Sequence, residues 1–288
     1  MKRGIGYACL GLLLGALLYE FGPDGSSDAG ISSGIPEPVR STMARLRSRR
    51  PFRRCEAALE LGRLQSGAAV PFLIPLLSDT EDAMPLLERP LQGSMMGSRS
   101  RAVRECAVTA LGQMGAAATP VLIQAAGGSD AEIRRHAVSV LSFSADPPAT
   151  QFMEGLLEDP DPLLRIAALT SVVQHGRPGK SEAIRRALQD SESRVRTQAL
   201  VFASAESEGW VYDVLIHASR DADVEVRSVA VDRLGARGDG RAVDILIDRL
   251  SDPDLAVRQR AHNSLRLLTR EDFGGDPAAW RAGRGTGR

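Results

Sequence analysis

The stretch DPDLAVRQRAHNSL at residues 252–265 repeats the pattern of DADVEVRSVAVDRL at residues 221–234, which begins 31 positions earlier. In both, an aliphatic residue stands directly before an arginine, and an alanine follows three positions after it. Arginines of this pattern recur at spacings of 30, 31, 31, 31 and 31 residues, at Arg104, Arg134, Arg165, Arg196, Arg227 and Arg258. A degenerate earlier copy aligns Arg54 with Ala57. Such periods indicate stacked helical repeats, because no single unit can bury its own apolar face.

Each copy predicts a helical hairpin. The aspartate and proline of DPD at residue 252 and DPDP at residue 159 suit a helix N-cap and first helical position. Apolar residues at intervals of four, as in Val226, Ala230 and Leu234, form one buried face, and the recurring alanine allows a neighbouring helix to approach. Glycines are expected to end several first helices, at Gly62, Gly112 and Gly235. The sequence therefore predicts an all-α solenoid of about seven helical hairpins over residues 39–270.

The recurring pattern D-x-D-x-x-V-R-x-x-A resembles the HEAT repeat family, in particular the short bacterial HEAT-like repeats also found in phycobilin lyase subunits. The resemblance extends over residues 50 to about 270. It implies an α-solenoid that binds another macromolecule along its curved surface, and it does not name the partner. Because the lyase subunits attach or detach bilins on such repeats, a bilin lyase-like activity is an alternative.

Two segments depart from the repeat. The spacing of 50 between Arg54 and Arg104 predicts an insertion at about 79–98, which would form a loop on one face of the solenoid. The segment LTREDFGGDPAAWRAG at residues 268–283 resembles a terminal motif of bacterial HEAT-repeat proteins, with Arg270 in place of its glycine. We expect Phe273 and Trp280 to cover the last repeat, within a C-terminal cap and tail at 271–288.

The N-terminal residues 1–21 predict a targeting element. Lys2 and Arg3 precede 16 uncharged, mainly apolar residues, from Gly4 to Tyr19. As a helix this run would span roughly 24 Å, a length that fits either a membrane anchor or a cleaved signal. The lack of a small-x-small cleavage pattern favours a single-pass anchor in the cell inner membrane. The positive-inside rule then places the repeats outside the cytoplasm. Residues 22–38, rich in Gly, Ser, Pro and Asp, predict a flexible linker.

The charge balance, aromatic content and cysteine content limit which classes of function the sequence supports. The 36 basic and 36 acidic residues cancel, and only 4% of residues are aromatic, so the composition does not favour nucleic-acid binding. Seven arginines between Arg40 and Arg54 could bind anionic lipid headgroups or an acidic partner, or could belong to a solvated capping helix. A disulfide between Cys55 and Cys106 is possible if the domain is exported.

No motif in the chain indicates catalysis. The aspartate and arginine four positions apart, as in Asp223 and Arg227, recur in successive repeats, which indicates a structural ladder rather than one active site. The four histidines lack a second ligand at helical spacing, and no phosphate loop or nucleophile motif is present. We therefore expect a protein that is not an enzyme, with no metal, cofactor or small-molecule substrate.

A binding surface is the remaining expectation. In the second helix near residue 245, Ala242, Val243, Leu246 and Leu250 should face the core, and Arg241, Asp244 and Asp248 should face outward. Equivalent positions continue an acidic row on the presumed concave side, composed of Glu182, Asp213, Asp244 and Asp248. An exposed Trp210 beside this row is the favoured contact residue, although a solvated helix face would carry the same carboxylates. The sequence thus predicts a membrane-tethered scaffold for a protein partner. A cytoplasm-facing scaffold and a structural envelope component are further alternatives.

Overall fold

The computed structural model describes residues 34–83, 101–206 and 209–285. The predicted anchor or signal at 1–21 and most of the predicted linker fall outside these ranges. Within them, no helix combines the length and apolar character needed to cross a bilayer. The described regular structure is helical apart from one antiparallel bridge between Asp82 and Ala102.

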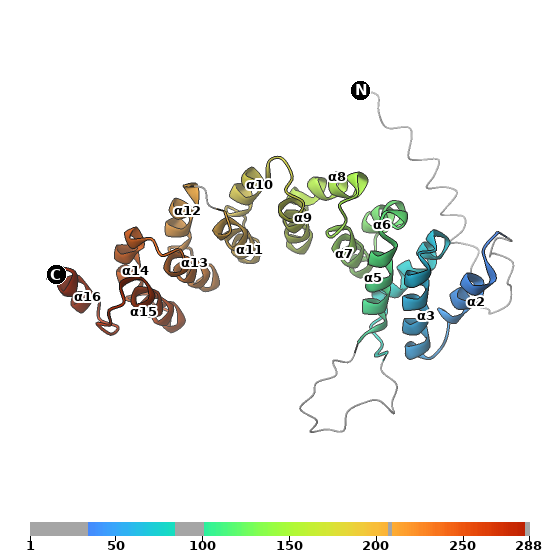
Figure 1. Ribbon diagram of the computed structural model, residues 1–288, viewed down its shortest axis with the longest axis horizontal. Helices are drawn as coiled ribbons and strands as arrows, with labels where there is room; N and C mark the ends of the chain where they lie inside the picture. The colour runs from blue at the N-terminus through green and yellow to red at the C-terminus, as the bar shows by residue number, and fades with distance from the viewer. Residues whose placement is uncertain (1–33, 84–100, 207–208, 286–288) are drawn as a thin grey trace, which may run out of the picture.

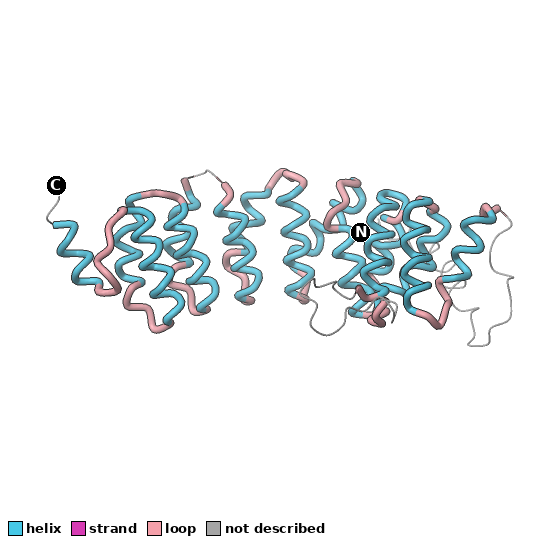
Figure 2. Tube along the Cα trace, turned by 60° about the horizontal axis from the view of Figure 1, so that its bottom comes forward, coloured by secondary structure: helices cyan, strands magenta, loops and turns pink. Residues whose placement is uncertain are grey.

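The helices form hairpins that stack along the length of the molecule (Figures 1 and 2), which confirms the predicted helical-repeat solenoid. The first helices, which carry the repeat arginines, are α3 (Pro51–Leu64), α5 (Val103–Met114), α7 (Ala131–Leu141), α9 (Pro162–Gln174), α11 (Ser193–Ser204), α13 (Val224–Ala236) and α15 (Leu255–Thr269). The second helices are α4 (Val70–Leu73) with the 3-10 helix η2 (Ile74–Ser78), α6 (Thr119–Ala126), α8 (Pro147–Gly155), α10 (Lys180–Ala187), α12 (Trp210–Ala218), α14 (Val243–Arg249) and α16 (Pro277–Gly285). A further helix, α2 (Glu37–Arg45), packs against α3 at the N-terminal end.

Aspartates cap several first helices, but the second aspartate of each D-x-D pair is the cap. Asp161 Oδ1 accepts a hydrogen bond from the Leu163 N–H at 2.9 Å, and Asp254 Oδ1 accepts one from the Ala256 N–H at 2.8 Å. Pro162 is therefore the first residue of its helix, as predicted. The prediction was wrong for Pro253, because α15 begins only after the cap at Asp254.

The repeat alanines lie where neighbouring first helices pack on each other. All are fully buried, with 0% exposure at Ala57, Ala107, Ala137, Ala168, Ala199, Ala230 and Ala261. A methyl group at these positions lets the next first helix approach closely while still excluding water. The predicted core residues of α14 are also buried, which confirms the inward face of that second helix.

The array is curved. In Figure 1 the first helices line the lower, inner side of an arch, and the second helices α8, α10, α12 and α14 lie along its outer side. First helices of adjacent hairpins contact each other directly along the whole array. Close packing on the first-helix side and wider spacing on the second-helix side are what curve a stack of hairpins.

The three glycines predicted to end first helices instead lie inside them. Gly62, Gly112 and Gly235 fall within α3, α5 and α13, each of which continues past its glycine. A Cβ atom on Gly235 would lie 2.9 Å from the Cα of Ser264, and one on Gly62 would lie 2.7 Å from the Cα of Ala110. Gly62 and Gly235 therefore permit close crossing of two first helices, because any side chain there would strike the neighbouring backbone.

Replacing Gly235 with alanine is expected to lower the free energy of unfolding by about 1–3 kcal/mol through overpacking against Ser264. The matched control is Gly112→Ala, since a Cβ atom there meets nothing within 4 Å. Alanine at position 112 should instead stabilise the helix by about 0.5–1 kcal/mol. Urea unfolding of both variants checks the pair, and equal effects of the same sign would contradict the close-crossing role.

The predicted insertion is closed at its base. The Ala83 N–H donates to Arg101 O at 2.9 Å, and the Val103 N–H donates to Glu81 O at 3.0 Å. The two chain segments that flank the insertion therefore meet beside the start of α5. Asp79 bonds to Arg54 in the manner of the other repeats and belongs to the hairpin rather than to the insertion. The insertion therefore begins later than residue 79, and residues 84–100 lie outside the described ranges.

The C-terminal segment covers the last hairpin. Trp280 on α16 is 0% exposed and is part of the apolar cluster built on α13, α14 and α15. Its Nε1–H donates to Gly274 O at 2.7 Å, and Phe273 contacts its ring edge-on at a centroid distance of 5.1 Å. Arg270 ends α15 with φ of 64°, in the left-handed region where glycine is the preferred residue. That conformation explains why the resembled motif carries glycine at this position.

A disulfide joins the first two hairpins. Cys55 of α3 and Cys106 of α5 are bonded, with their Cα atoms 5.2 Å apart. The sequence only allowed this bond, because it does not specify how closely the two helices approach. The insertion between the hairpins does not separate α3 from α5, which pack side by side.

Candidate functional site

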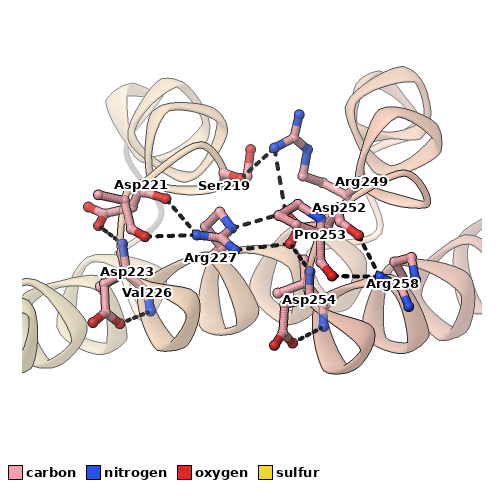
Figure 3. A network of polar contacts seen from close by, with 12 residues as sticks. Ser219, Asp221, Asp223, Val226, Arg227, Arg249, Asp252, Pro253, Asp254 and Arg258 are labelled. Carbon is pink, nitrogen blue, oxygen red and sulfur yellow. Dashed lines mark hydrogen bonds and ion pairs between the residues drawn. The ribbon is translucent and has the colours of Figure 1, made fainter.

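The repeat arginines tie each hairpin to the next. Arg227 donates from Nε to Asp252 Oδ2 at 2.9 Å and from Nη2 to Asp252 Oδ1 at 3.0 Å, while its Nη1 donates to Asp221 O at 3.0 Å (Figure 3). Arg196 bonds in the same way to Asp221, the aspartate 25 residues further along. We call this set of contacts the arginine ladder. Each rung spans two hairpins, so the partner is not the aspartate four residues before the arginine.

The ladder carboxylates are committed to structural contacts. Asp252 also accepts a hydrogen bond from the Asp254 N–H at 3.0 Å, and its side chain is only 1% exposed. Burial raises the pKa of the Asp252 carboxyl, but hydrogen bonds from Arg227 and the Asp254 N–H outweigh burial and leave its pKa below the ordinary value. An ionised carboxylate that accepts hydrogen bonds from an arginine on both oxygens has a structural role rather than that of an acid or base.

The ladder is incomplete across α5 and α7. The position six residues before Arg134 is Gly128 rather than an aspartate, and within the described ranges the carboxylate that Arg104 reaches is Glu132, at 4.0 Å. Arg134 Nε is buried without a hydrogen-bond partner among the described residues. The adjacent Arg135 instead donates to Asp161 at 2.9 Å. Continuous rungs therefore hold only the C-terminal hairpins, from α9 to α15.

Two further arginines differ from what the sequence predicted. Arg258 on α15 donates to Asp252 O at 2.7 Å and to Pro253 O at 2.8 Å, and its side chain bonds no carboxylate among the described residues. Arg54, which belongs only to a degenerate copy, makes a rung with Asp79 at 2.8 Å. The rung of Arg54 could have been predicted from its spacing of 25 residues to an aspartate, because the arginines of α9, α11 and α13 have the same spacing to their partners.

The predicted acidic row lies on the outer side of the arch. Its members are exposed, and they come from α10, α12 and α14 at Glu182, Asp213, Asp244 and Asp248. Figure 1 places these second helices on the convex side, so the prediction of a concave location was wrong. The alternation of apolar residues identifies the face of a helix that is buried, but the direction of curvature depends on which helices pack closest between hairpins.

Arginines of the same surface neutralise part of the row. Glu182 lies 3.5 Å from Arg186 and 3.8 Å from Arg185, and Asp248 lies 2.8 Å from Arg281 of the C-terminal helix. Glu182 also lines a hollow of about 410 Å³ beside α9 and α10. The row is therefore a face of mixed charge rather than a continuous acidic surface.

Trp210 is half-buried rather than exposed, which corrects the prediction. Its ring packs against the apolar clusters on both sides of α12, and the guanidinium carbon of Arg185 lies 4.8 Å from the ring centroid. The interaction of a cation with an indole face contributes about 1 kcal/mol. Trp210 thus joins α10 to α12, and its ring face is already covered by Arg185.

The inner side of the arch carries few charges around α9 and α11. Apart from the ladder arginines, the one charged residue on these two helices is the exposed Arg194, near the start of α11. The other exposed or partly exposed side chains include Leu163, Ile166 and Thr170 on α9, and Thr197, Gln198 and Val201 on α11. Leu163 is 44% exposed. On the neighbouring α13 and α15, by contrast, Asp232 and Arg260 form an ion pair.

The described residues show no arrangement typical of a metal centre. No group of three or more His, Cys, Asp or Glu side chains in these ranges could hold a metal ion. His262 Nε2 lies 2.7 Å from Asp272 Oδ1, and Arg266 lies 3.0 Å from the other oxygen of that carboxylate. These contacts attach the C-terminal segment to α15.

Stacked hairpins joined through first helices define a helical-repeat solenoid, and sequence comparison identifies its family. The family model for HEAT repeats matches residues 91–172 and 212–279, and the PBS lyase HEAT-like repeat model matches residues 53–79. The chain belongs to the HEAT repeat family, as the repeat pattern predicted. No curated protein sequence shows significant similarity to it.

Several solved structures are similar to this chain. The complex of CpcE and CpcF of phycocyanin lyase from Nostoc sp. PCC7120 is 21% identical, covers 85% of this chain and 100% of the matched chain, and gives a TM-score of 0.39. Human deoxyhypusine hydroxylase is 19% identical over 83% of this chain and 86% of its own, with a TM-score of 0.36. YibA of Escherichia coli is 14% identical over 99% and 98% of the two chains, with a TM-score of 0.48. At these identities the similarity concerns architecture and indicates no activity.

Proposed function

We propose that this protein is a scaffold that binds a protein partner on the inner face of its arch, around α9 and α11. The observation that supports the proposal is the low charge of these two helices, which carry Arg194 as their one charge besides the ladder arginines and have Leu163, Ile166 and Val201 at least partly exposed. Protein interfaces are depleted of charge at their centres, because an unpaired charge would lose its hydration on binding. The Asp232–Arg260 ion pair of the neighbouring α13 and α15 would then form part of a polar rim.

The arginine ladder favours binding by a preformed surface. Arg165 holds Asp190 and Arg196 holds Asp221, so α9, α11 and α13 are fixed relative to one another by charged hydrogen bonds on both oxygens. A surface that is rigid before binding loses less conformational entropy when the partner docks. The proposed surface thus lies within the continuous block of ladder rungs, from α9 to α15.

The proposed location is outside the cytoplasm. The Cys55–Cys106 disulfide supports it, because such bonds persist in oxidising compartments and are rare in reducing ones. The proposal includes the N-terminal run of residues 1–21 as a membrane tether, which would raise the local concentration of the scaffold near membrane partners. That segment is outside the described residues, so the tether is argued from its sequence alone.

The test is a crosslinked pull-down of the tagged full-length chain from native membranes. Thr170→Arg with Val201→Arg places two cations on the inner face and should reduce capture of the partner at least about ten-fold, since each buried cation must lose its hydration. Gln151→Arg with Gln189→Arg adds the same charge at exposed positions on α8 and in the turn after α10, and should leave capture unchanged. All variants must retain the helical circular dichroism of the parent.

A third variant examines the rival surface. Asp213→Arg with Asp244→Arg reverses two members of the acidic row and should leave capture intact if the inner face is the binding site. Loss of the partner in this variant alone would assign binding to the outer side. Failure of the parent to enrich any partner would favour the structural envelope component instead.

A bilin lyase-like activity is the second candidate. It is favoured by the match of residues 53–79 to the PBS lyase HEAT-like repeat model. Incubating the purified chain with a bilin and an acceptor biliprotein, and measuring the covalent adduct by absorbance, separates this candidate from the scaffold. Adduct formation above the uncatalysed rate would support the enzyme.

A further inference from the structure

The turn before α3 reverses the charge of the turns that begin the other well-formed repeats. Before α9, α11, α13 and α15 this turn carries two acidic residues, Asp159 and Asp161, Asp190 and Glu192, Asp221 and Asp223, and Asp252 and Asp254 respectively. At the same two positions before α3, six and four residues ahead of Arg54, stand Ser48 and Arg50. We call residues 47–53 the basic turn, since Arg47, Arg49, Arg50 and Arg53 lie within it.

The basic turn keeps the shape of its acidic counterparts. Arg54 Nη1 donates to Ser48 O at 2.8 Å, as Arg227 does to Asp221 O, and the Arg50 N–H donates to Ser48 Oγ at 3.2 Å. Arg50 is nevertheless a poor N-cap, because its side chain makes no capping hydrogen bond and its charge opposes the helix dipole. A residue that weakens its own helix start calls for a role other than folding.

Three guanidinium groups of the turn are available for binding. Arg49, Arg50 and Arg53 are exposed, and their side chains make no ion pair or hydrogen bond within the described part of the chain. Nearby carboxylates are occupied elsewhere: Glu60 accepts from Arg45 at 2.8 Å, and Asp79 accepts from Arg54 at 2.8 Å. In a chain whose 36 basic and 36 acidic residues cancel, this turn is a local positive excess.

An exposed aromatic ring accompanies these cations. Phe52 is 41% exposed, between Arg50 and Arg53 on the first turn of α3. Guanidinium groups around a solvent-facing phenyl ring match the interface of an anionic bilayer, where cations meet headgroup phosphates and the ring enters the acyl boundary. An acidic peptide would satisfy the arginines but would leave the phenyl ring without a partner.

We infer that the basic turn docks on an anionic lipid surface. Arg49, Arg50 and Arg53 contact the headgroup phosphates, and Phe52 inserts at the boundary between headgroups and acyl chains. The turn lies between α2 and α3, at the N-terminal end of the described array (Figure 1), away from α9 and α11. Contact through this end leaves the inner face open, so this inference does not depend on the proposed function.

The test uses the purified full-length chain and sedimentation with two kinds of vesicle, phosphatidylcholine alone and phosphatidylcholine mixed with phosphatidylglycerol. The parent should partition more strongly onto the anionic vesicles. Each cation near the surface contributes about a five-fold change in partition, so Arg50→Asp, a change of two charges, should reduce anionic partition about 25-fold. The same variant should raise the thermal unfolding midpoint, because aspartate restores the helix cap.

The matched control is Arg194→Asp. Arg194 is exposed, lies in the first turn of α11, and makes no ion pair within the described residues, so the same charge change is made near a helix start but not at the cap position. Its anionic partition should equal that of the parent. Binding to phosphatidylcholine alone should be the same for all variants, since none of them changes the N-terminal apolar run.

Two results would overturn the inference. One is that Arg50→Asp retains the anionic preference, or that Arg194→Asp loses it equally. The other is a combined result, in which Phe52→Ser binds the vesicles as well as the parent does and duplex DNA binds the parent as strongly as the vesicles do. That result would make the turn a general polyanion site.

Discussion

Replacing both Cys55 and Cys106 with alanine is expected to lower the free energy of unfolding by about 4 kcal/mol. The disulfide closes a loop whose ends are 51 residues apart, and it restricts the unfolded chain by an amount that grows with loop length. The loop contains the insertion, so without the bond the unfolded chain regains the conformational freedom of the whole segment between the two cysteines. Urea unfolding of the parent and the double variant under oxidising conditions measures the difference.

Reduction supplies the control. Parent protein unfolded in the presence of dithiothreitol should fall to the stability of the double variant, and the double variant should not respond to the reductant. Because solenoid stability is a sum over neighbouring repeats, the loss should be confined to the N-terminal hairpins. Hydrogen exchange should therefore accelerate in α3 and α5 and stay unchanged in α13 and α15. A parent midpoint that is insensitive to reductant would contradict the stabilising role.

Substitution of Asp252 by alanine is expected to lower the free energy of unfolding by about 3 kcal/mol. The substitution removes both carboxylate oxygens from Arg227 and leaves that guanidinium without its ladder partner. The expected loss is at the lower end for a buried pair, because the Arg227 side chain is 12% exposed and regains some hydration. Asp213→Ala, at an exposed carboxylate of the outer face, should change stability by less than about 0.5 kcal/mol.

The effect of Asp252→Ala should depend on pH. The folded pKa of the Asp252 carboxyl lies below its ordinary value near 3.9, so its stabilising contribution is complete above that pH and is lost as the pH falls through the folded pKa. The parent and the variant should therefore converge in stability in acid and differ most near neutrality. Urea midpoints measured from neutral pH downward check this, and a difference that stays constant into acid would exclude the charged pair as its cause.

Much of the local structure could be predicted from residue pattern. The arginine period set the number of hairpins, the recurring alanines marked positions that are all fully buried, and the aliphatic residues of 242–250 identified the inward face of a second helix. These features depend on helix periodicity and side-chain size, which act within a few residues. The cap at Asp161 followed from the same local rules, whereas the cap of α15 was predicted at Asp252, two residues before the observed cap at Asp254.

The candidate site was harder to predict. The acidic row was located on the correct helices but on the wrong side of the arch, and Trp210 was expected to be exposed although Arg185 covers its ring. Both errors concern relations between hairpins. Periodicity within one helix does not predict the distance to the next helix or which side chain of the next helix makes a contact.

By itself the sequence determined that this chain is a HEAT-repeat solenoid, the period of its hairpins, and which small residues its first helices bury. Only the tertiary structure decided that each ladder arginine binds an aspartate 25 residues away, that Cys55 meets Cys106, and that α9 and α11 lie on the inner side of the arch. The physical reason is the range of the forces involved. Helix formation and capping act along a few residues, whereas curvature and cross-hairpin bonds depend on the summed packing distances between neighbouring helices.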